Sequence, residues 1–197
     1  RGEVDEALRL HQEELNVYEE LGDQRSRAVT LGDIARIKVS RGEVDEALRL
    51  HQEELNVYEE LGDQRSRAVT LGDIARIKVS RGEVDEALRL HQEELNVYEE
   101  LGDQRERAVT LGDIAQISLK QGDIEDAFEY LKESYEICFQ LGALDGISFY
   151  GLQLGQLLCH FNQTEEGLAI LKRSKEGFIQ LQQPQMAQQI DEIMKDI

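Results

Sequence analysis

The feature that most constrains this chain is an internal repeat with a period of 40 residues. Residues 1–40 and 41–80 are identical, and residues 81–120 differ from the second copy at five positions. Those positions are Ser66, Arg76, Lys78, Val79 and Ser80, which become Glu106, Gln116, Ser118, Leu119 and Lys120. After residue 120 the same spacing continues only as similarity. A fixed period of about 20 to 50 residues is the signature of stacked units, so we expect a repeat architecture over the whole chain.

Each copy of the repeat contains two amphipathic helical patterns. The first places apolar residues at the three- and four-residue intervals of a helix face: Val44, Ala47, Leu48, Leu55 and Tyr58. The second does the same: Ala68, Leu71, Ile74, Ala75 and Ile77. Gly62 follows the first pattern as a helix-ending residue, and Asp63 can cap the second helix by accepting hydrogen bonds from its first N–H groups. The sequence therefore predicts two antiparallel helices per repeat.

These helix pairs are apolar on more than one side and must stack on neighbouring pairs, which predicts an all-α solenoid of about ten helices. We expect one domain over residues 1–197. Its parts are an orphan second helix (1–23) whose partner has been cut off, four helix pairs (24–63, 64–103, 104–142 and 143–182) and a C-terminal capping helix (183–197). Pro184 suits the first turn of that last helix. Because the chain begins inside a repeat, we expect a fragment of a longer protein.

Composition and charge argue against several classes of function. The net charge of −19 disfavours a nucleic-acid partner, because phosphate groups must be neutralised by clustered Lys and Arg. No apolar run reaches membrane-spanning length and no signal-peptide pattern is present, so we expect a cytoplasmic protein without a membrane partner. Cys138 and Cys159 fall in no zinc-ligand or CxxC spacing, and we interpret both as reduced core residues.

The sequence carries no nucleophile elbow, phosphate-binding loop or zinc-protease motif, so we expect neither an enzyme nor a bound cofactor. His11, His51 and His91 each precede a glutamate by three residues. Equivalent residues of stacked repeats lie about 20 Å apart, too far to share one metal ion, so we interpret these side chains as core or rim histidines. His160 is interpreted in the same way. We therefore predict no metal site.

One stretch of the repeat carries a family resemblance. Leu71-Gly72-Asp73-Ile74-Ala75, then Gly82, then Asp85-Glu86-Ala87-Leu88 resembles the tetratricopeptide motif, in which a glycine and small residues mark close helix contacts. The period and the Leu-Gly-Asp run are most similar to the 40-residue Leu-Gly-Asn variety of LGN-type scaffolds, kinesin light chains and bacterial regulators. This resemblance implies a right-handed superhelical solenoid of antiparallel helix pairs.

Some positions depart from that family pattern. Lys38 and Lys78 stand where the family usually has a tyrosine, and Glu54 stands where it has a small residue. A buried, unpaired charge is costly, so each of these side chains needs a partner or access to solvent. In the third unit both positions lose their charge together: Ser118 and Ser134. We therefore predict that Lys38 pairs with Glu54, and that Lys78 pairs with Glu94.

The two helices of a repeat also differ in charge. Residues 1–23 hold two basic and eight acidic groups, whereas residues 24–40 hold four basic groups and one acidic group. By the resemblance, the first helix of each pair lines a concave groove, which is then less acidic than the convex back. The ligand that we expect there is an extended or helical peptide. The expected groove residues, besides Val29, are Asp33, Arg36, Val39, Ser40, Asp73, Arg76, Val79, Ser80, Asp113, Gln116, Gln153 and Gln156.

Arg36 and Arg76 match the position at which chaperone-binding relatives hold a peptide's C-terminal carboxylate. Gly32 and Gly72 stand where a lysine would help, and Gln116 replaces the third arginine, so we do not expect that ligand. Intramolecular ion pairs with Asp or Glu are an equally good interpretation of the two arginines.

The sequence thus predicts a protein-interaction scaffold with specificity in its divergent C-terminal units. The last groove-facing helix differs most from its counterparts: Gly151, Gln153, Gln156, Leu157 and His160. One alternative is a structural spacer or self-associating array that stacks end to end through the open face of the orphan helix: Val4, Leu8, Leu15 and Tyr18. Another is the sensor part of a larger bacterial regulator or ATPase.

Overall fold

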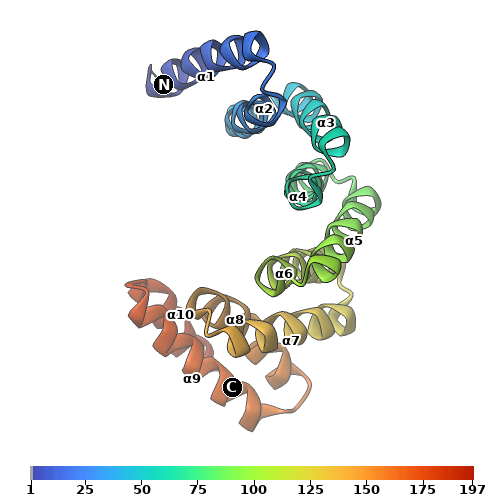
Figure 1. Cartoon of the computed structure of the whole chain (residues 1–197). Helices are drawn as coiled ribbons and strands as arrows, with labels where there is room; N and C mark the ends of the chain where they lie inside the picture. Colours follow the sequence, from blue (N-terminus) through green and yellow to red (C-terminus); the bar gives the residue numbers. More distant parts are fainter. Residues whose placement is uncertain (1) are drawn as a thin grey trace. The chain divides into compact units, whose positions relative to one another are not determined.

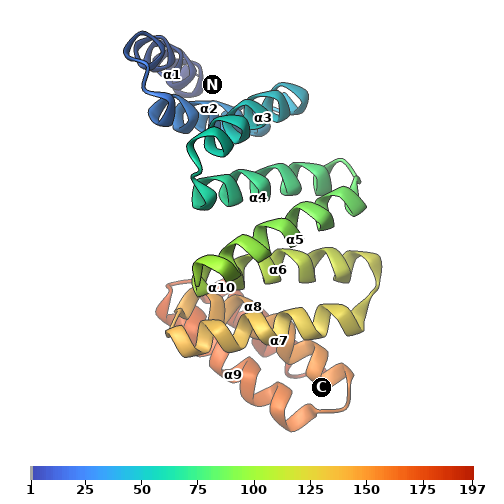
Figure 2. The same cartoon turned by 45° about the vertical axis from the view of Figure 1, so that its right-hand side comes forward.

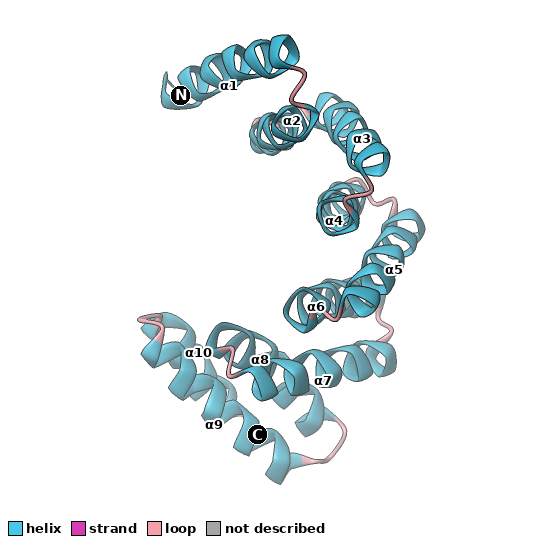
Figure 3. Cartoon of the chain, viewed as in Figure 1, coloured by secondary structure: helices cyan, strands magenta, loops and turns pink. Residues whose placement is uncertain are grey.

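The computed structural model of the protein describes residues 2–197, apart from the side chain of Glu3. Ten helices and no strand occupy this range, which confirms the all-α prediction (Figures 1 and 3). The helices are α1 (Gly2–Leu21), α2 (Gln24–Ser40), α3 (Val44–Leu61), α4 (Gln64–Ser80), α5 (Val84–Leu101), α6 (Gln104–Gln121), α7 (Ile124–Leu141), α8 (Leu144–His160), α9 (Thr164–Gln180) and α10 (Pro184–Ile193).

The chain divides into two compact units, Arg1–Val97 and Tyr98–Ile197. Within each unit, helices pack on their neighbours in sequence, as Figure 2 shows for α2 on α3, and α8 packs on α9 in the same way. We call the even-numbered helices first-type helices and the odd-numbered helices second-type helices. The repeat spacing places α10 in the first-type position, because Pro184 lies four periods after Gln24.

The predicted helix ends and caps are present. Gly62 ends α3 in the left-handed conformation with a φ of 66°, which an L side chain rarely adopts. The carboxylate of Asp63 accepts a hydrogen bond from the Ser66 N–H at 3.1 Å and thereby caps α4. In the last unit Asn162 takes the glycine position with a φ of 61°. Asparagine tolerates the left-handed conformation better than most residues, so the helix still ends at this position although the glycine is replaced.

Small residues let each first-type helix approach its partner closely. Ala28 of α2 is fully buried against Val57 and Tyr58 of α3. Gly32, one turn further along, faces the carboxylate of Glu54, and a methyl group added at Gly32 would lie 2.5 Å from Oε1 of that side chain. The α2–α3 contact is therefore built on an alanine and a glycine four residues apart, which share one helix face.

A buried histidine–glutamate pair occupies the space left by this glycine. Nδ1 of His51 lies 2.8 Å from Oε2 of Glu54, and both side chains are buried. His91 and Glu94 repeat the arrangement in α5 at the same distance. The polar groups satisfy each other, which removes much of the cost of burying them.

The predicted pairs of Lys38 with Glu54 and of Lys78 with Glu94 are wrong. Nζ of Lys38 lies 2.6 Å from Glu43 and 3.0 Å from Glu46, across the turn that joins α2 to α3. Lys78 makes the corresponding pairs with two acids at the start of α5: Glu83 and Glu86. The lysines lie in the last turn of their helices, whereas the buried glutamates face glycines located more than one turn earlier, beside the histidines.

The second unit solves the same packing problem with different residues. The ring of Tyr150 lies over Gly112, where the glutamate carboxylate lies in the first unit. Ser134 replaces that glutamate, and its hydroxyl donates a 2.7 Å hydrogen bond to the Ala108 carbonyl. The joint loss of charge at Ser118 and Ser134 therefore reflects two separate local changes, since Ser118 instead donates to the Ile114 carbonyl.

This packing makes a prediction for Gly32→Ala. The added methyl group would force the Glu54 carboxylate away and break its hydrogen bond to His51. The free energy of unfolding should therefore fall by about 1–3 kcal/mol. In a His51→Leu/Glu54→Ser background, which copies the residues of the second unit, the same substitution should be neutral or stabilising, because alanine favours helix by about 0.5–1 kcal/mol. Urea denaturation followed by circular dichroism measures both effects.

Gly2→Ala is the control for this experiment, because nothing lies within 4 Å of a methyl group added there. An equal cost of Gly32→Ala in both backgrounds would contradict the proposed contact.

Candidate functional site

The predicted groove residues lie on the first-type helices. We call the exposed and half-buried side chains of α2 and α4, and separately of α6 and α8, the first-type face of each unit. In the first unit its exposed members are Arg36, Val39, Ser40, Arg76 and Ser80, and its half-buried members are Asp33, Asp73 and Val79. In the second unit Gln156 is exposed, and the half-buried members are Asp113, Gln116 and Gln153.

Ion pairs connect α2 and α4 across the first-type face. Nη2 of Arg36 lies 2.9 Å from Asp73, and its Nη1 lies 3.1 Å from Asp33. Asp73 also accepts from Arg76 at 2.9 Å. The alternative of intramolecular ion pairs is thus confirmed for both arginines. Because these groups are half exposed, the pairs contribute little stability, and their main effect is to hold the guanidinium groups in fixed positions.

A pocket of about 220 Å³ lies beside these arginines on the first-type face. Most of its lining residues come from α4, and the buried His51 of α3 also lines it. The lining residues are Arg36, Val39, His51, Asp73, Arg76, Ile77 and Ser80. The pocket combines an apolar wall with two fixed cations, so it can accept a small apolar side chain next to an acceptor group.

The second unit keeps the contact between first-type helices but removes its charge. The Gln116 amide donates to the Gln153 side-chain oxygen, with the same 37-residue separation that joins Arg36 to Asp73. An amide pair therefore replaces a charged pair in the same register. Val79, Asp113 and Gln156 lie outside the pockets described for either unit.

An apolar pocket of about 260 Å³ opens on the second unit near the start of α8. Phe149, which is 51% exposed, forms one wall, and Val109, Tyr150, Phe178 and Leu181 contribute to the others. Burial raises the pKa of Tyr150 to about 12, so its hydroxyl stays protonated and can donate a hydrogen bond. Sequence reasoning missed Phe149. The available signal was its position, where Val29 and its repeats become an aromatic residue.

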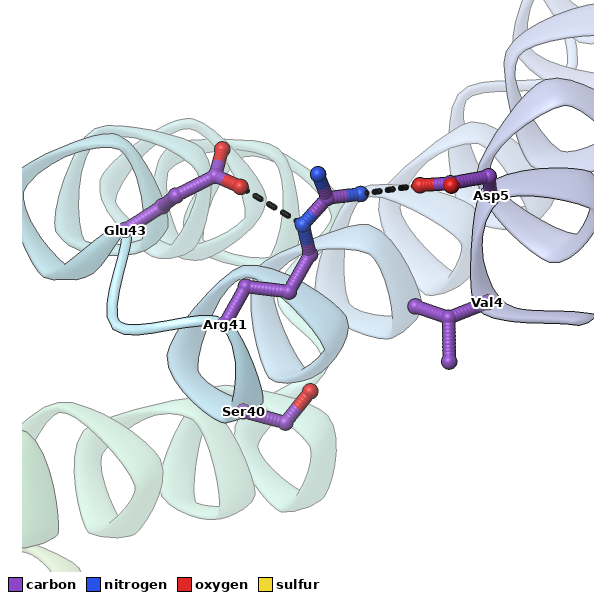
Figure 4. A pocket seen from close by; sticks show the side chains of 5 residues that line it. All are labelled: Val4, Asp5, Ser40, Arg41 and Glu43. Atoms are coloured by element: carbon purple, nitrogen blue, oxygen red, sulfur yellow. Dashed lines mark hydrogen bonds and ion pairs between the residues drawn. The ribbon is translucent and has the colours of Figure 1, made fainter. Parts of the chain in front are cut away.

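Ser40, also predicted for the groove, lies at a different pocket of about 420 Å³ between α1 and the end of α2. Figure 4 shows Arg41 there, with its guanidinium between Asp5 and Glu43 at 2.7 Å from each. Arg81 repeats the arrangement with two other acids: Asp45 and Glu83. The repetition identifies a structural link between successive second-type helices, and its charges are already paired.

A further pocket of about 480 Å³ lies between α7 and α9, where α8 supplies Leu154 and Leu158. Arg173 borders it, donating to the Tyr135 hydroxyl at 2.9 Å and lying 4.8 Å from the centre of the Phe139 ring. In the earlier repeats a glutamate takes the position of Arg173 and pairs with an arginine of the partner helix, as Glu53 does with Arg27. Sequence reasoning missed this reversal of charge.

The described chain offers few other sites. Among residues 2–197, no group of three or more His, Cys, Asp or Glu side chains is placed to hold a metal ion. None of the helices in this range combines the length and apolarity needed to cross a bilayer. Cys138 and Cys159 are free thiols, the first buried and the second partly buried.

Comparison with known proteins identifies the fold. The sequence model of the tetratricopeptide repeat family matches residues 1–60 and 66–138. The chain belongs to the tetratricopeptide repeat family. No curated protein sequence matches this tetratricopeptide repeat chain.

Solved structures with tetratricopeptide-like folds superpose on most of the chain. BtubC (BKLC) from P. vanneervenii aligns with a TM-score of 0.79 and 18% identity, over 92% of this chain and 75% of that chain. A putative kinesin light chain of Podosopora anserina with nearly identical TPR-like repeats aligns with a TM-score of 0.67 and 19% identity, over 92% and 90%. A Rap protein complexed with Competence and Sporulation Factor gives 0.69 and 16%, over 96% and 57%. Similarity at these identities establishes the fold.

The two thiols should differ in reactivity. Burial raises the pKa of Cys138 to about 11, so at pH 8 only about one molecule in a thousand carries the reactive thiolate. Cys159 is less buried, so iodoacetamide should modify it at least about tenfold faster, as peptide mass spectrometry would measure. The single variants Cys138→Ser and Cys159→Ser assign each rate. Equal rates would contradict the buried position of Cys138.

Proposed function

We propose that this tetratricopeptide chain is a non-enzymatic, cytoplasmic scaffold of the 40-residue Leu-Gly-Asn-like variety, which binds a peptide segment of another protein along its first-type face. The observation that carries this proposal is the apolar Phe149 pocket, in the position where the repeats hold valine. The Rap protein complexed with Competence and Sporulation Factor supports it as an example of this fold with a bound factor. We further propose that residues 1–197 act as one domain, with repeats at 24–63, 64–103, 104–142 and 143–182 and a cap at 183–197.

The two units have different roles in this proposal. The first unit offers the same charged side chains in each repeat, so its contacts are periodic and carry little sequence information. The second unit offers the Gln116–Gln153 amide pair and the exposed ring of Phe149, which occur once each. Aromatic anchors surrounded by polar groups supply much of the affinity of peptide interfaces. Selectivity therefore resides in the second unit.

The ligand best suited to this face has one large apolar side chain for the Phe149 pocket and amide or hydroxyl groups near Gln153. A free C-terminal carboxylate is not required, because Arg36 and Arg76 already share Asp73 as an intramolecular acceptor. The pocket of about 220 Å³ in the first unit is a separate, smaller site.

Selection from a random-peptide phage library, followed by calorimetry, tests this function. Selected peptides should bind the wild-type protein, and Phe149→Ala should weaken binding about tenfold or more, because it removes the aromatic wall. Phe139→Ala is the matched control, since Phe139 has the same 51% exposure but lies on the second-type helix α7. Failure to select any peptide, or equal binding by Phe149→Ala and wild type, would contradict the proposal.

End-to-end stacking of chains, the alternative function, fits the surfaces of α10 and α1 less well. Such stacking would bring α10 of one copy onto α1 of the next. Gln188 and Glu192 of α10 stand where α2 has Ala28 and Gly32, and both are exposed. Their bulk prevents a close approach, and Glu192 would face the acidic α1 with like charge.

Light scattering over a range of protein concentrations measures whether the chains associate in solution. We expect a constant mass near 22.5 kDa, the mass of one chain. A mass that rises with concentration would instead support the self-associating array.

A further inference from the structure

One group of charged residues recurs in each of the first three repeats. An arginine near the start of a first-type helix pairs with a glutamate of the second-type helix on either side, as Arg67 does with Glu59 and Glu93. Arg27 and Arg107 make the corresponding pairs in their own repeats. The arginine side chain is mostly buried, so the two carboxylates neutralise a charge that lies between three helices.

The last repeat replaces all three members of this group. The residues one period after Glu99, Arg107 and Glu133 are Phe139, Ile147 and Arg173. Ile147 is buried, whereas Phe139 and Arg173 are exposed. The Arg173 guanidinium donates to the Tyr135 hydroxyl at 2.9 Å and lies 4.8 Å from the centre of the Phe139 ring. In the part of the chain that the structure describes it makes no ion pair, so no carboxylate of the protein neutralises its charge.

Arg173 borders the pocket of about 480 Å³ between α7 and α9. The apolar part of the lining comes from three helices: Phe128, Leu154, Leu158, Ala169 and Ile170. Lys132 adds a second exposed cation, which forms no ion pair within residues 2–197. The volume lies in the range of small-molecule sites, which combine an apolar lining with a few well-placed polar groups.

The other polar groups of this pocket limit the charge of its ligand. Glu136 and Glu166 also line it, and both are exposed. Their charges oppose a polyanion, but a single carboxylate can lie against Arg173. The Tyr135 hydroxyl accepts a hydrogen bond from Arg173, so its own proton can be donated to the same carboxylate. A guanidinium and a phenol beside an apolar pocket therefore match a carboxylate that carries an apolar body.

We propose that the pocket between α7 and α9 binds an organic carboxylate with an aliphatic or aromatic body, and that Arg173 holds the carboxylate group. The apolar body would lie against three buried side chains: Leu154, Leu158 and Ile170. The residues that line this pocket include no member of the first-type face, so the proposal is independent of peptide binding there.

Isothermal titration calorimetry of octanoate into the full chain at pH 7 tests this inference. We expect saturable binding with a Kd of about 1 mM or lower, since a small ligand with an apolar body and one charged contact can reach that affinity. Octanamide has the same length and no charge. It should bind at least about tenfold more weakly, because it cannot form a charge-assisted pair with the guanidinium.

Two variants assign the contact to its residues. Arg173→Gln should weaken octanoate binding about tenfold or more, because it removes the charged donor. Lys172→Gln is the matched control and should leave binding unchanged, since it removes the same charge from the adjacent exposed position, outside the pocket lining. Ala169→Gln places a longer side chain at an exposed position of the lining, so it should also weaken binding at least about tenfold.

Methyl nuclear magnetic resonance locates the bound molecule. Octanoate should shift the methyl signals of Ile170, which lines the pocket, and leave those of Ile114 in α6 unchanged. Absence of saturable octanoate binding, equal binding of octanamide, unchanged binding by Arg173→Gln or an equal loss in Lys172→Gln would each overturn the inference.

Discussion

The close contact between a first-type helix and the second-type helix that follows it is the interaction on which the rest of the structure depends. Ala28 and Gly32 bring the α2 backbone near α3, and the space above the glycine determines what the partner helix carries. In the first unit the side chain that faces the glycine is the Glu54 carboxylate. A buried carboxylate must be paired, which accounts for the buried His51 beside it. In the second unit it is the ring of Tyr150 over Gly112, and the histidine–glutamate pair is absent there. One backbone approach thus accommodates two different side-chain solutions.

Local features of the fold were predictable from sequence because they depend on residues close in the chain. Gly62 and Asp63 identify a helix end and a cap by their own conformational preferences. Comparison of the repeats could not predict the partner of Lys38. The positions of Lys38 and Glu54 lose their charges in the same repeat, as Ser118 and Ser134, which suggests a contact between them. The structure shows that these two changes are independent. The carboxylate three residues after His51 was the better signal, because residues three apart lie on one helix face. Phe149 and Arg173 were missed because their importance depends on pockets formed by other helices.

The proposed selectivity for one ligand depends on the part of the chain in which the repeats cease to be identical. The identical repeats provide a periodic charged face, and periodic contacts alone cannot distinguish one ligand sequence from another. Divergence in the second unit replaces charge with amides and adds the exposed aromatic ring of Phe149. At the other end of the sequence, α1 repeats the residues of α3, but Leu10 and Val17 are about half exposed where Leu50 and Val57 are buried. The physical rule that a second-type helix needs a first-type partner therefore accounts for the packing of α3.

Hydrogen exchange of backbone amides, measured by nuclear magnetic resonance with residue-specific assignments, tests this rule most directly. Helices α1 and α3 have one sequence, so intrinsic exchange rates and helix propensity are matched. Central amides of α1 should exchange at least about a hundredfold faster than their counterparts in α3, because α2 covers Val57 and Glu54 in α3 and no described helix covers the same face of α1. Equal protection of the two helices in dilute solution would contradict this rule.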